Sequence, residues 1–337
     1  MERRGAMARG TRFKRDISGE KKKMALSWKI TISILSFILI LLIVVISIFF
    51  YYFGGLRTVP FTQDSDVLGI EQQVEEITGD IDITNIALFG VDSREHDDTG
   101  RSDALLIMSV DKVHGKIKLT SIARDTRVYL SDRGSYDKIT HAYAYGGPEM
   151  SIKTINQNFK TNIKEYVTVN FDQLATVINA LGGVTITITE AERVSANENI
   201  AALGTGTLIQ RSGTVLLTGE QAVGYSRIRK IDSDSMRAQR QRTVLNAMFE
   251  KLKGRSLLEY ADFVRQMLPN VETSLNYGDL MGLATIMFGS ITMEQMAFPN
   301  DNSNARGGIF YSDGVWYYEY DLDVAAKQLH QFIYEDN

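Results

Sequence analysis

The sequence NIALFGVDSR at residues 85–94 is followed by GRSDALLIMSVD at 100–111 and by TSIARDTRV at 120–128. Each stretch combines a run of apolar residues with charged residues at one end, which is typical of strands buried in a sheet. We expect one strand over Ile83–Val91 and a hairpin made of Leu105–Asp111 and Lys116–Ile122. The charged residues at the strand ends are then the first candidates for a site.

These charged residues converge if the hairpin has the expected register. Its turn centres on residues 113–114, so paired residues have numbers that sum to about 227. Asp103 then lies opposite Arg124, with Arg101 close by. Asp92 follows the first strand at its carboxyl end, which is where open α/β sheets bind ligands. We therefore expect these four side chains at one edge of the sheet.

Two carboxylates beside two guanidinium groups suit two different roles. Mg²⁺ takes oxygen ligands and is usually held by one or two carboxylates together with substrate phosphates. Arginine binds phosphate oxygens through paired hydrogen bonds. The set is thus compatible with a metal–diphosphate site, and equally with a structural cluster of ion pairs on a solvated loop.

A second group of basic residues surrounds the start of a predicted long helix, from about Asp234 to Lys253. Arg227 and Arg229 precede this helix. One stripe at helical spacing within it combines polar and apolar side chains: Arg237, Arg240, Gln241, Val244, Met248 and Leu252. Guanidinium groups on a core-facing stripe require an anion, either a ligand or a nearby acid such as Asp232 or Asp234. The arginines outnumber the acids nearby, which favours a ligand.

The segment YDKITHAYAYGGPE lies between these two groups, at residues 136–149. Lys138 is a candidate phosphate contact, although a surface lysine before a helix has the same pattern. His141 is expected to be structural, and Pro148 to begin a helix.

Composition excludes several classes of site. The 337 residues include no cysteine, so a disulfide framework, a thiolate zinc site, an iron–sulfur cluster and a cysteine nucleophile are excluded. The four histidines do not form an HExxH motif, which excludes a zincin. Residues 30–337 contain 27 basic and 38 acidic residues. This acidic body argues against nucleic acid as a partner.

The amino-terminal region predicts a membrane anchor. Residues 1–29 form a basic arm with ten Lys or Arg and three acids, and residues 30–53 contain no charge. A helix of that length spans a bilayer, and its aromatic end is more typical of an anchor than of a cleaved signal peptide. The positive-inside rule places the arm in the cytoplasm and the body outside it, on a single-pass protein of the cell membrane.

The remaining chain is expected to form one domain. Residues 54–82 have the composition of a juxtamembrane linker, with a short helical turn around Ile70–Ile77, and residues 83–337 alternate predicted strands and helices. This alternation predicts an α/β fold with a mixed central sheet flanked by helices. The role of residues 255–337, including FYSDGVWYYEYD at 310–321, is open beyond completing that domain.

At the motifs above, the chain resembles the LytR-CpsA-Psr family of cell-envelope enzymes. The resemblance rests on four blocks, which cover roughly residues 83–253 in the family's order: FGVDSR with GRSDALLIMSVD, SIARDTRV, KITHAYAYGGPE, and LTGEQAVGYSRIRKIDSDSMRAQRQR. Two departures occur, since Ala123 replaces the proline of SIPRDT and Arg242 replaces the second glutamine of RxxRQQ. Neither affects the candidate carboxylates.

The resemblance implies a membrane-bound phosphotransferase of a Gram-positive type of envelope. Such enzymes attach a glycopolymer (teichoic acid, capsule or a related polysaccharide) from a polyprenyl-pyrophosphate carrier to the C6 hydroxyl of N-acetylmuramic acid in peptidoglycan. The partners implied are this lipid-linked polymer, peptidoglycan and membrane lipid.

The resemblance also assigns roles to individual residues. Asp92 and Asp103 would hold Mg²⁺ or Mn²⁺, and with Arg124 they form the implied catalytic set. Pyrophosphate would be bound by Arg101, Arg124, Arg127, Lys138, Arg227, Arg229, Arg237, Arg240 and Gln241. An apolar tunnel for the polyprenyl tail would be lined by Ile155, Leu174, Ile178 and Met248.

Three other functions remain open from the sequence. The same site would hydrolyse the polyprenyl pyrophosphate if water replaced the sugar hydroxyl. A non-catalytic scaffold would bind lipid-linked glycans without turnover or metal dependence. A transcriptional regulator, an older name for such proteins, conflicts with the acidic body and its predicted location outside the cytoplasm.

Overall fold

The computed structural model describes residues 39–43, 57–92, 100, 102–204, 206–286, 289 and 291–335. The chain divides into two units, residues 1–54 and 55–337. In the first unit, residues 39–43 are helical and exposed. No helix among the described residues combines the length and apolar character needed to span a bilayer. The predicted arm at 1–29, and the predicted anchor at 30–53 apart from 39–43, lie outside the described residues.

A seven-stranded sheet forms the centre of the second unit. Its strands, in spatial order, are β1 (Arg57–Thr58), β10 (Glu272–Thr273), β7 (Glu165–Asn170), β2 (Ile83–Val91), β3 (Ser102–Asp111), β4 (Lys116–Ile122) and β11 (Thr292–Phe298). β3 is antiparallel to β2 and β4, whereas β7 is parallel to β2 and β11 is parallel to β4. The carboxyl ends of β7, β2, β4 and β11 therefore meet at one edge of the sheet. The mixed sheet predicted from sequence is confirmed.

The predicted hairpin register is confirmed as well. Leu106 pairs with Ser121 and Asp111 pairs with Lys116, so the residue numbers of each pair sum to 227. The neighbouring β2–β3 ladder is irregular near its end, because the register shifts between Gly90 and Val91. Asp103 falls in this β-bulge and has no partner in the ladder, which changes the direction of its side chain relative to a regular strand.

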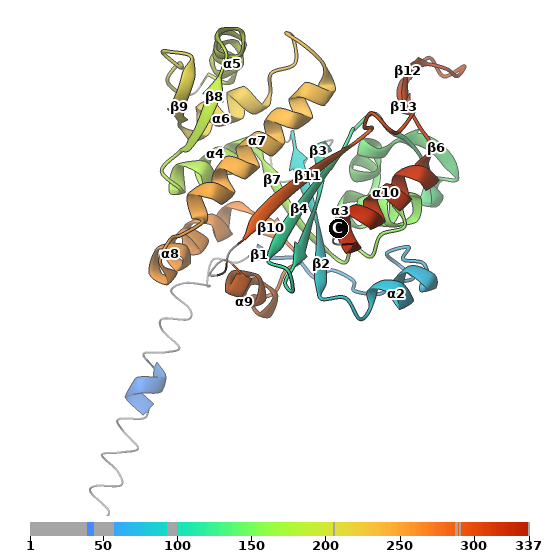
Figure 1. Cartoon of the computed structure of the whole chain (residues 1–337), viewed down its shortest axis with the longest axis horizontal. Helices are drawn as coiled ribbons and strands as arrows, with labels where there is room; N and C mark the ends of the chain where they lie inside the picture. Colours follow the sequence, from blue (N-terminus) through green and yellow to red (C-terminus); the bar gives the residue numbers. More distant parts are fainter. Residues whose placement is uncertain are drawn as a thin grey trace, which may run out of the picture. The chain divides into compact units, whose positions relative to one another are not determined.

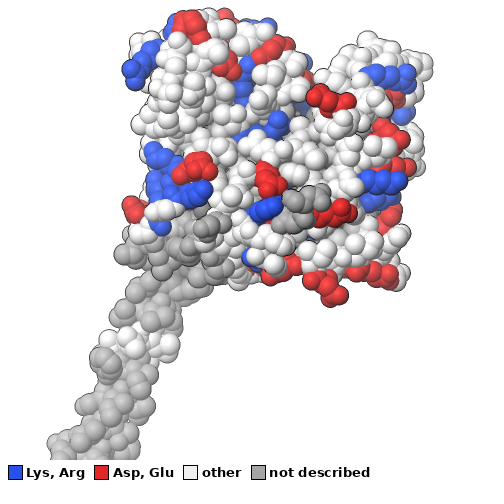
Figure 2. All heavy atoms as spheres, viewed as in Figure 1, with Lys and Arg blue, Asp and Glu red and all other residues white. Residues whose placement is uncertain are grey.

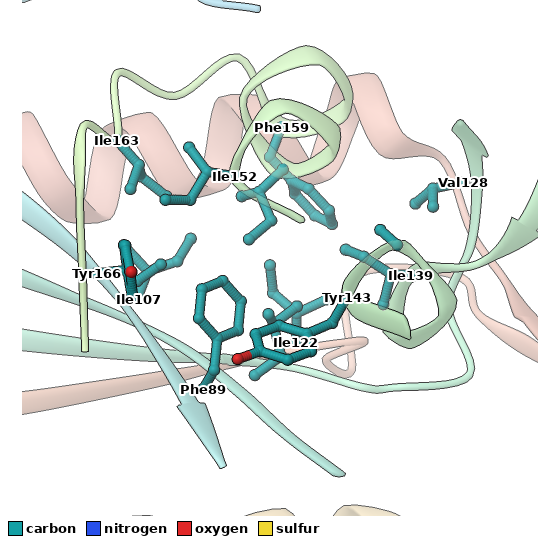
Figure 3. Packing of buried hydrophobic residues seen from close by; sticks show 14 of the residues in the cluster. Phe89, Ile107, Ile122, Val128, Ile139, Tyr143, Ile152, Phe159, Ile163 and Tyr166 are labelled. Atoms are coloured by element: carbon teal, nitrogen blue, oxygen red, sulfur yellow. The ribbon is translucent and has the colours of Figure 1, made fainter. Parts of the chain in front are cut away.

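Helices cover both faces of the sheet (Figure 1). α3 (Ile139–Phe159) and α10 (Leu322–Tyr334) lie on one face, and α7 (Asp234–Leu252) lies on the other. Successive side chains of β3 point to opposite faces of the sheet and so pack against both layers of helices. Ile107 packs toward α3, and Met108 packs in a cluster with Phe249 of α7. Figure 3 shows the larger core, in which the rings of Phe89 and Tyr143 lie 5.1 Å apart.

Helix α3 contains an interruption where the sequence predicts a helix start. Gly146 and Gly147 have non-helical backbone angles, and Gly147 has φ of 61°. Pro148 follows and begins the second helical segment, where its fixed φ and missing N–H cost nothing. The first segment, before the interruption, was not predicted.

A lobe with its own core adjoins the sheet. It contains the hairpin of β8 (Val184–Ile188) and β9 (Gly213–Leu217) with helices α4 (Phe171–Ala180), α5 (Glu190–Leu203) and α6 (Gly219–Ser226). A capping box of Thr218 and Gln221 begins α6. Gly219 permits close packing there, because a Cβ atom on it would lie 2.0 Å from the carbonyl oxygen of Ala175.

Smaller elements complete the second unit: the hairpin of β5 (Arg127–Leu130) and β6 (Ser135–Lys138), the hairpin of β12 (Arg306–Ile309) and β13 (Trp316–Glu319), and helices α2 (Gln72–Thr78), α8 (Leu257–Met267) and α9 (Tyr277–Ile286). The body begins before Ile83, because Leu68, Ile70 and Val74 are buried in the main core. The segment interpreted as a linker thus contributes to the domain from β1 onward.

Candidate functional site

A small cavity lies at the edge of the sheet where β4 ends and α7 begins. Its volume is about 40 Å³, and Asp103, Arg124, Arg237 and Gln241 are among its lining residues. Four residues that the resemblance assigned to one site are therefore brought together. Residues that the sequence analysis did not assign to the site also line it: Ser121, Asp125, Asp234, Ser235 and Tyr318.

Arg124 forms the centre of this cluster. Its Nη1 donates to Oδ1 of Asp103 at 2.8 Å, and its Nε lies 3.5 Å from Oδ2 of Asp125. Burial by itself lowers the pKa of Arg124, but the charges of Asp103, Asp125 and Asp234 outweigh it and raise the pKa above the ordinary value. The guanidinium is therefore always charged, and its orientation is fixed from several sides.

Asp234 connects Arg124 with two further arginines. Its Oδ2 lies 3.6 Å from Nη2 of Arg124, and its Oδ1 lies 3.1 Å from Nε of Arg229 and 3.8 Å from Nη1 of Arg237. It is the first residue of α7, after the N-cap Ser233, where a negative charge complements the helix dipole. Burial, followed by the charge of Arg124, lowers the pKa of Arg237. The positive charges of these guanidinium groups are thus only partly neutralised by the nearby carboxylates.

Lys138 reaches the same cluster through Asp125. Its Nζ donates to Oδ1 of Asp125 at 2.6 Å, while the other carboxylate oxygen faces Arg124. Arg242 also approaches the cavity wall, where its Nη1 donates to Oγ of Ser121. Burial lowers the pKa of Arg242 with no opposing contribution.

Arg240 and Arg227 are not among the residues that line the cavity. Arg240 is 3% exposed and is paired with Glu192 at 2.9 Å and with Asp232. It therefore has intramolecular counter-charges, which the sequence analysis had left open as one alternative. The guanidinium of Arg227 lies 4.3 Å from the ring centre of Phe171.

Arg127 is also separated from Arg124, although only two residues intervene. Its guanidinium lies 4.1 Å from the ring centre of Tyr136 and 3.9 Å from that of Tyr311. Its Nη1 is 3.8 Å from Oε1 of Glu319. A turn at Arg124–Asp125, closed by a hydrogen bond from the Thr126 N–H to the Ala123 carbonyl, separates the two arginines and directs Arg127 elsewhere.

The structure describes only some of the residues that the sequence predicts at the metal site. Asp92 is exposed directly after β2, opposite the amino end of β3 where Asp103 lies. Arg101 lies outside the described residues. Within the described ranges, no three Asp, Glu, Cys or His side chains converge on one point. The carboxylates of Asp92 and Asp103 fit Mg²⁺ or Mn²⁺, because they supply hard oxygen ligands. Phosphate and water would complete the coordination shell of the ion.

The residues expected to line a tunnel are divided between two cores. Ile155 is fully buried in the core on the α3 side of the sheet. Ile178, Leu174 and Met248 pack in the core of the lobe. Apolar spacing could not separate these environments, because both produce the same pattern in sequence.

Comparisons with known proteins agree with this architecture. A family model, LytR_cpsA_psr, matches residues 61–332. The polyisoprenyl-teichoic acid–peptidoglycan teichoic acid transferase TagU of Bacillus mycoides (strain KBAB4) is 32% identical over 273 residues, which are 80% of this chain and 82% of TagU.

Solved structures show the same fold. "TagT bound to LIIa-WTA" matches with a TM-score of 0.61 and 28% identity, over 76% of this chain and 92% of that one. "LytR-CPS2A-psr family protein YwtF (TagT) with bound octaprenyl pyrophosphate lipid" matches with a TM-score of 0.57 and 26% identity, over 75% and 90%. Since the family model spans most of the chain and the fold is shared, this protein belongs to the LytR_cpsA_psr family.

Proposed function

We propose that this protein transfers a glycopolymer from a polyprenyl-pyrophosphate carrier to peptidoglycan. The convergence of Arg124, Arg229 and Arg237 around Asp234 carries the proposal, because this cluster offers a diphosphate several donors at one edge of the sheet. The names of the relatives support it, since TagU is called a peptidoglycan teichoic acid transferase and one matching structure holds octaprenyl pyrophosphate.

In the proposed reaction, a sugar hydroxyl of peptidoglycan attacks the phosphorus that carries the glycan. A new P–O bond forms to that oxygen, and the P–O bond to polyprenyl phosphate breaks. The proton of the hydroxyl leaves to a base, for which Asp92 and Asp103 are the candidates. Arg124 and Arg237 stabilise the charge on the phosphate oxygens, and positioning supplies most of the rate, as in other phosphoryl transfers. The acceptor position is the C6 hydroxyl of N-acetylmuramic acid, and the polymer is teichoic acid, capsule or a related polysaccharide.

Asp92 and Asp103 would hold Mg²⁺ or Mn²⁺. When bound, the ion would neutralise charge on the diphosphate. Asp103 would then serve two partners, because its Oδ1 already accepts a hydrogen bond from Arg124. Residues 30–53 would anchor the chain in the cell membrane, with the body outside the cytoplasm, where both substrates meet.

The test uses the full chain in detergent with a synthetic polyprenyl-pyrophosphoryl glycan, uncrosslinked peptidoglycan and Mg²⁺. Mass spectrometry should find glycan joined to peptidoglycan through a single phosphate. Arg124→Ala should reduce turnover by about a hundredfold or more. Arg265→Ala, which removes an arginine paired with Asp262 on α8, is the matched control. Released glycan phosphate without a joined product would instead establish hydrolysis, and normal turnover by Arg124→Ala would refute the site.

A further inference from the structure

The segment 301–323 is unusually rich in aromatic residues. Six of its residues are aromatic, namely Phe310, Tyr311, Trp316, Tyr317, Tyr318 and Tyr320, whereas aromatic residues make up 9% of the whole chain. Most of this segment is the hairpin β12–β13, which projects from the body in Figure 1. Nothing in the proposed chemistry of the phosphate site accounts for these rings.

The hairpin holds its rings at the surface. Phe310, Tyr311 and Trp316 are 37–38% exposed. Gly307 and Gly308 make room for them, since a Cβ atom at Gly307 would lie 2.5 Å from the Trp316 ring and one at Gly308 would lie 2.9 Å from the Phe310 ring. Glycine is a poor strand residue, and here it allows rings to lie against the backbone. The two glycines thus fix the positions of the Trp316 and Phe310 rings, which remain accessible to a ligand.

Contacts around Arg127 fix the hairpin to the body. The guanidinium of Arg127 stacks between Tyr136 and Tyr311. Glu319 joins this contact, because its carboxylate accepts hydrogen bonds from Arg306 and from the hydroxyl of Tyr311. Such stacking and charge pairing hold the surface in one arrangement before any ligand arrives.

A cavity of about 430 Å³ opens beside this contact, and Arg127, Tyr136, Asn304, Glu319 and Asp323 are among its lining residues. Planar amide, carboxylate and guanidinium groups are hydrogen-bonding partners for ring hydroxyls, and aromatic rings pack against the C–H face of a sugar. The cavity lies on the face of the hairpin opposite Trp316 and Tyr318, so it is the rings of that other face that border the phosphate site, and such rings suit a sugar.

The hairpin is continuous with the phosphate site. Tyr318 of β13 lines the site cavity, and its backbone N–H donates to the carbonyl of Asp125 at 2.9 Å. The ring of Trp316 packs edge-on against that of Tyr318, with ring centres 4.6 Å apart. A ligand on the exposed face of Trp316 is therefore separated from the cavity by a single ring.

We propose that hairpin β12–β13, through the exposed ring of Trp316, binds the amino-sugar strand of peptidoglycan and presents its hydroxyl to the phosphate site. This inference rests on the proposed function and assigns a binding surface to the acceptor, peptidoglycan. Charge disfavours other occupants, because residues 301–323 contain five acidic residues and one basic residue. An acidic surface repels an anionic membrane, a nucleic acid and a polyol-phosphate polymer on the donor, but not an uncharged sugar face.

The test measures binding to the full chain in detergent. Insoluble peptidoglycan stripped of wall polymer is sedimented with the wild type, Trp316→Ala, Trp316→Tyr and the control Leu216→Ala, which removes a side chain 60% exposed on β9. Trp316→Ala should bind about five to ten times more weakly. Trp316→Tyr should retain most of the binding, and Leu216→Ala all of it.

A second readout follows the ring itself. The chain has two tryptophans, so Trp28→Phe leaves Trp316 as the sole tryptophan. Uncharged N-acetylglucosamine oligomers, which present the same amino-sugar face, should then shift its fluorescence with saturation, whereas anionic vesicles and a polyol-phosphate polymer should not. Equal sedimentation of Trp316→Ala and Leu216→Ala, or a response to vesicles or polyol phosphate alone, would overturn the inference.

The two proposals fail in different ways. A wild type that binds glycan strands but joins no glycan to peptidoglycan refutes the proposed function and leaves the glycan surface standing. A wild type that performs transfer, with the same KM for peptidoglycan in Trp316→Ala, refutes the glycan surface alone.

Discussion

Replacing Arg240 by methionine should destabilise the protein without removing a ligand of the phosphate. Arg240 is 3% exposed and serves both Asp232 and Glu192. Methionine preserves much of the side-chain length but leaves two carboxylates without their cation. Removing one partner of a fully buried ion pair costs about 3–5 kcal/mol. Because Asp232 and Glu192 are 25% and 15% exposed, solvent should reduce this to about 2–3 kcal/mol.

The comparison variant is Arg237→Met, one turn earlier on α7. The pKa of Arg237 is lowered by burial and by the charge of Arg124, so its removal relieves repulsion and should change stability by less than about 1 kcal/mol. Its loss should nevertheless slow donor cleavage by about a hundredfold, since it faces the cavity. Thermal denaturation of the full chain should show Arg240→Met unfolding about 5 °C below the wild type.

Acid provides an independent check on the same ion pair. The hydrogen bond from Arg240 lowers the pKa of Asp232, so its stabilisation is present above the unfolded-state pKa of about 4 and is lost as the pH falls through the folded-state value. The difference in Tm between wild type and Arg240→Met should therefore shrink below about pH 4. An Arg240→Met protein with wild-type Tm and defective donor cleavage would refute this reasoning and return Arg240 to the phosphate site.

Three further substitutions test other features. Asp234→Asn should make the thermal stability respond more strongly to inorganic pyrophosphate than that of the wild type, because the anion replaces the lost counter-charge of three arginines; an equal response would contradict that role. Arg242→Gln should raise the free energy of unfolding by about 1 kcal/mol, since burial is the only influence on its pKa, and a measured loss would show that the cation is compensated. Gly219→Ala should lower stability by about 1–3 kcal/mol in urea denaturation, because its Cβ would meet the Ala175 carbonyl; an unchanged midpoint would mean that the helices separate freely.

Local patterns were sufficient to predict much of the sheet. The strand Ile83–Val91 and the register of the β3–β4 hairpin followed from apolar runs and one turn, and both are as expected. The ion pair of Asp103 with Arg124 was expected from that register, although neither residue is paired in the β3–β4 ladder. The segment before Ile83 was misinterpreted because its polar composition hides a few buried residues such as Leu68.

Sequence patterns do not determine the direction in which a side chain points. Arg124 and Arg127 lie in one motif, and Arg237 and Arg240 lie on one predicted stripe, yet in each pair only the first faces the cavity. Neither periodicity nor resemblance reports which acid an arginine meets. Asp234 was visible in the sequence as a nearby acid at the start of a helix, and that position was the available signal for its role.

The separate core of the lobe affects how mutations should be distributed. Asp103 and Arg124 are positioned by the sheet, whereas Asp234 and Arg237 are carried by α7, which Arg240 ties to Glu192 in the lobe. Substitutions in α5 or α6 can therefore disable the site while the sheet remains folded. Random mutagenesis should recover inactive but well-expressed alleles in the lobe, far from any residue that touches phosphate.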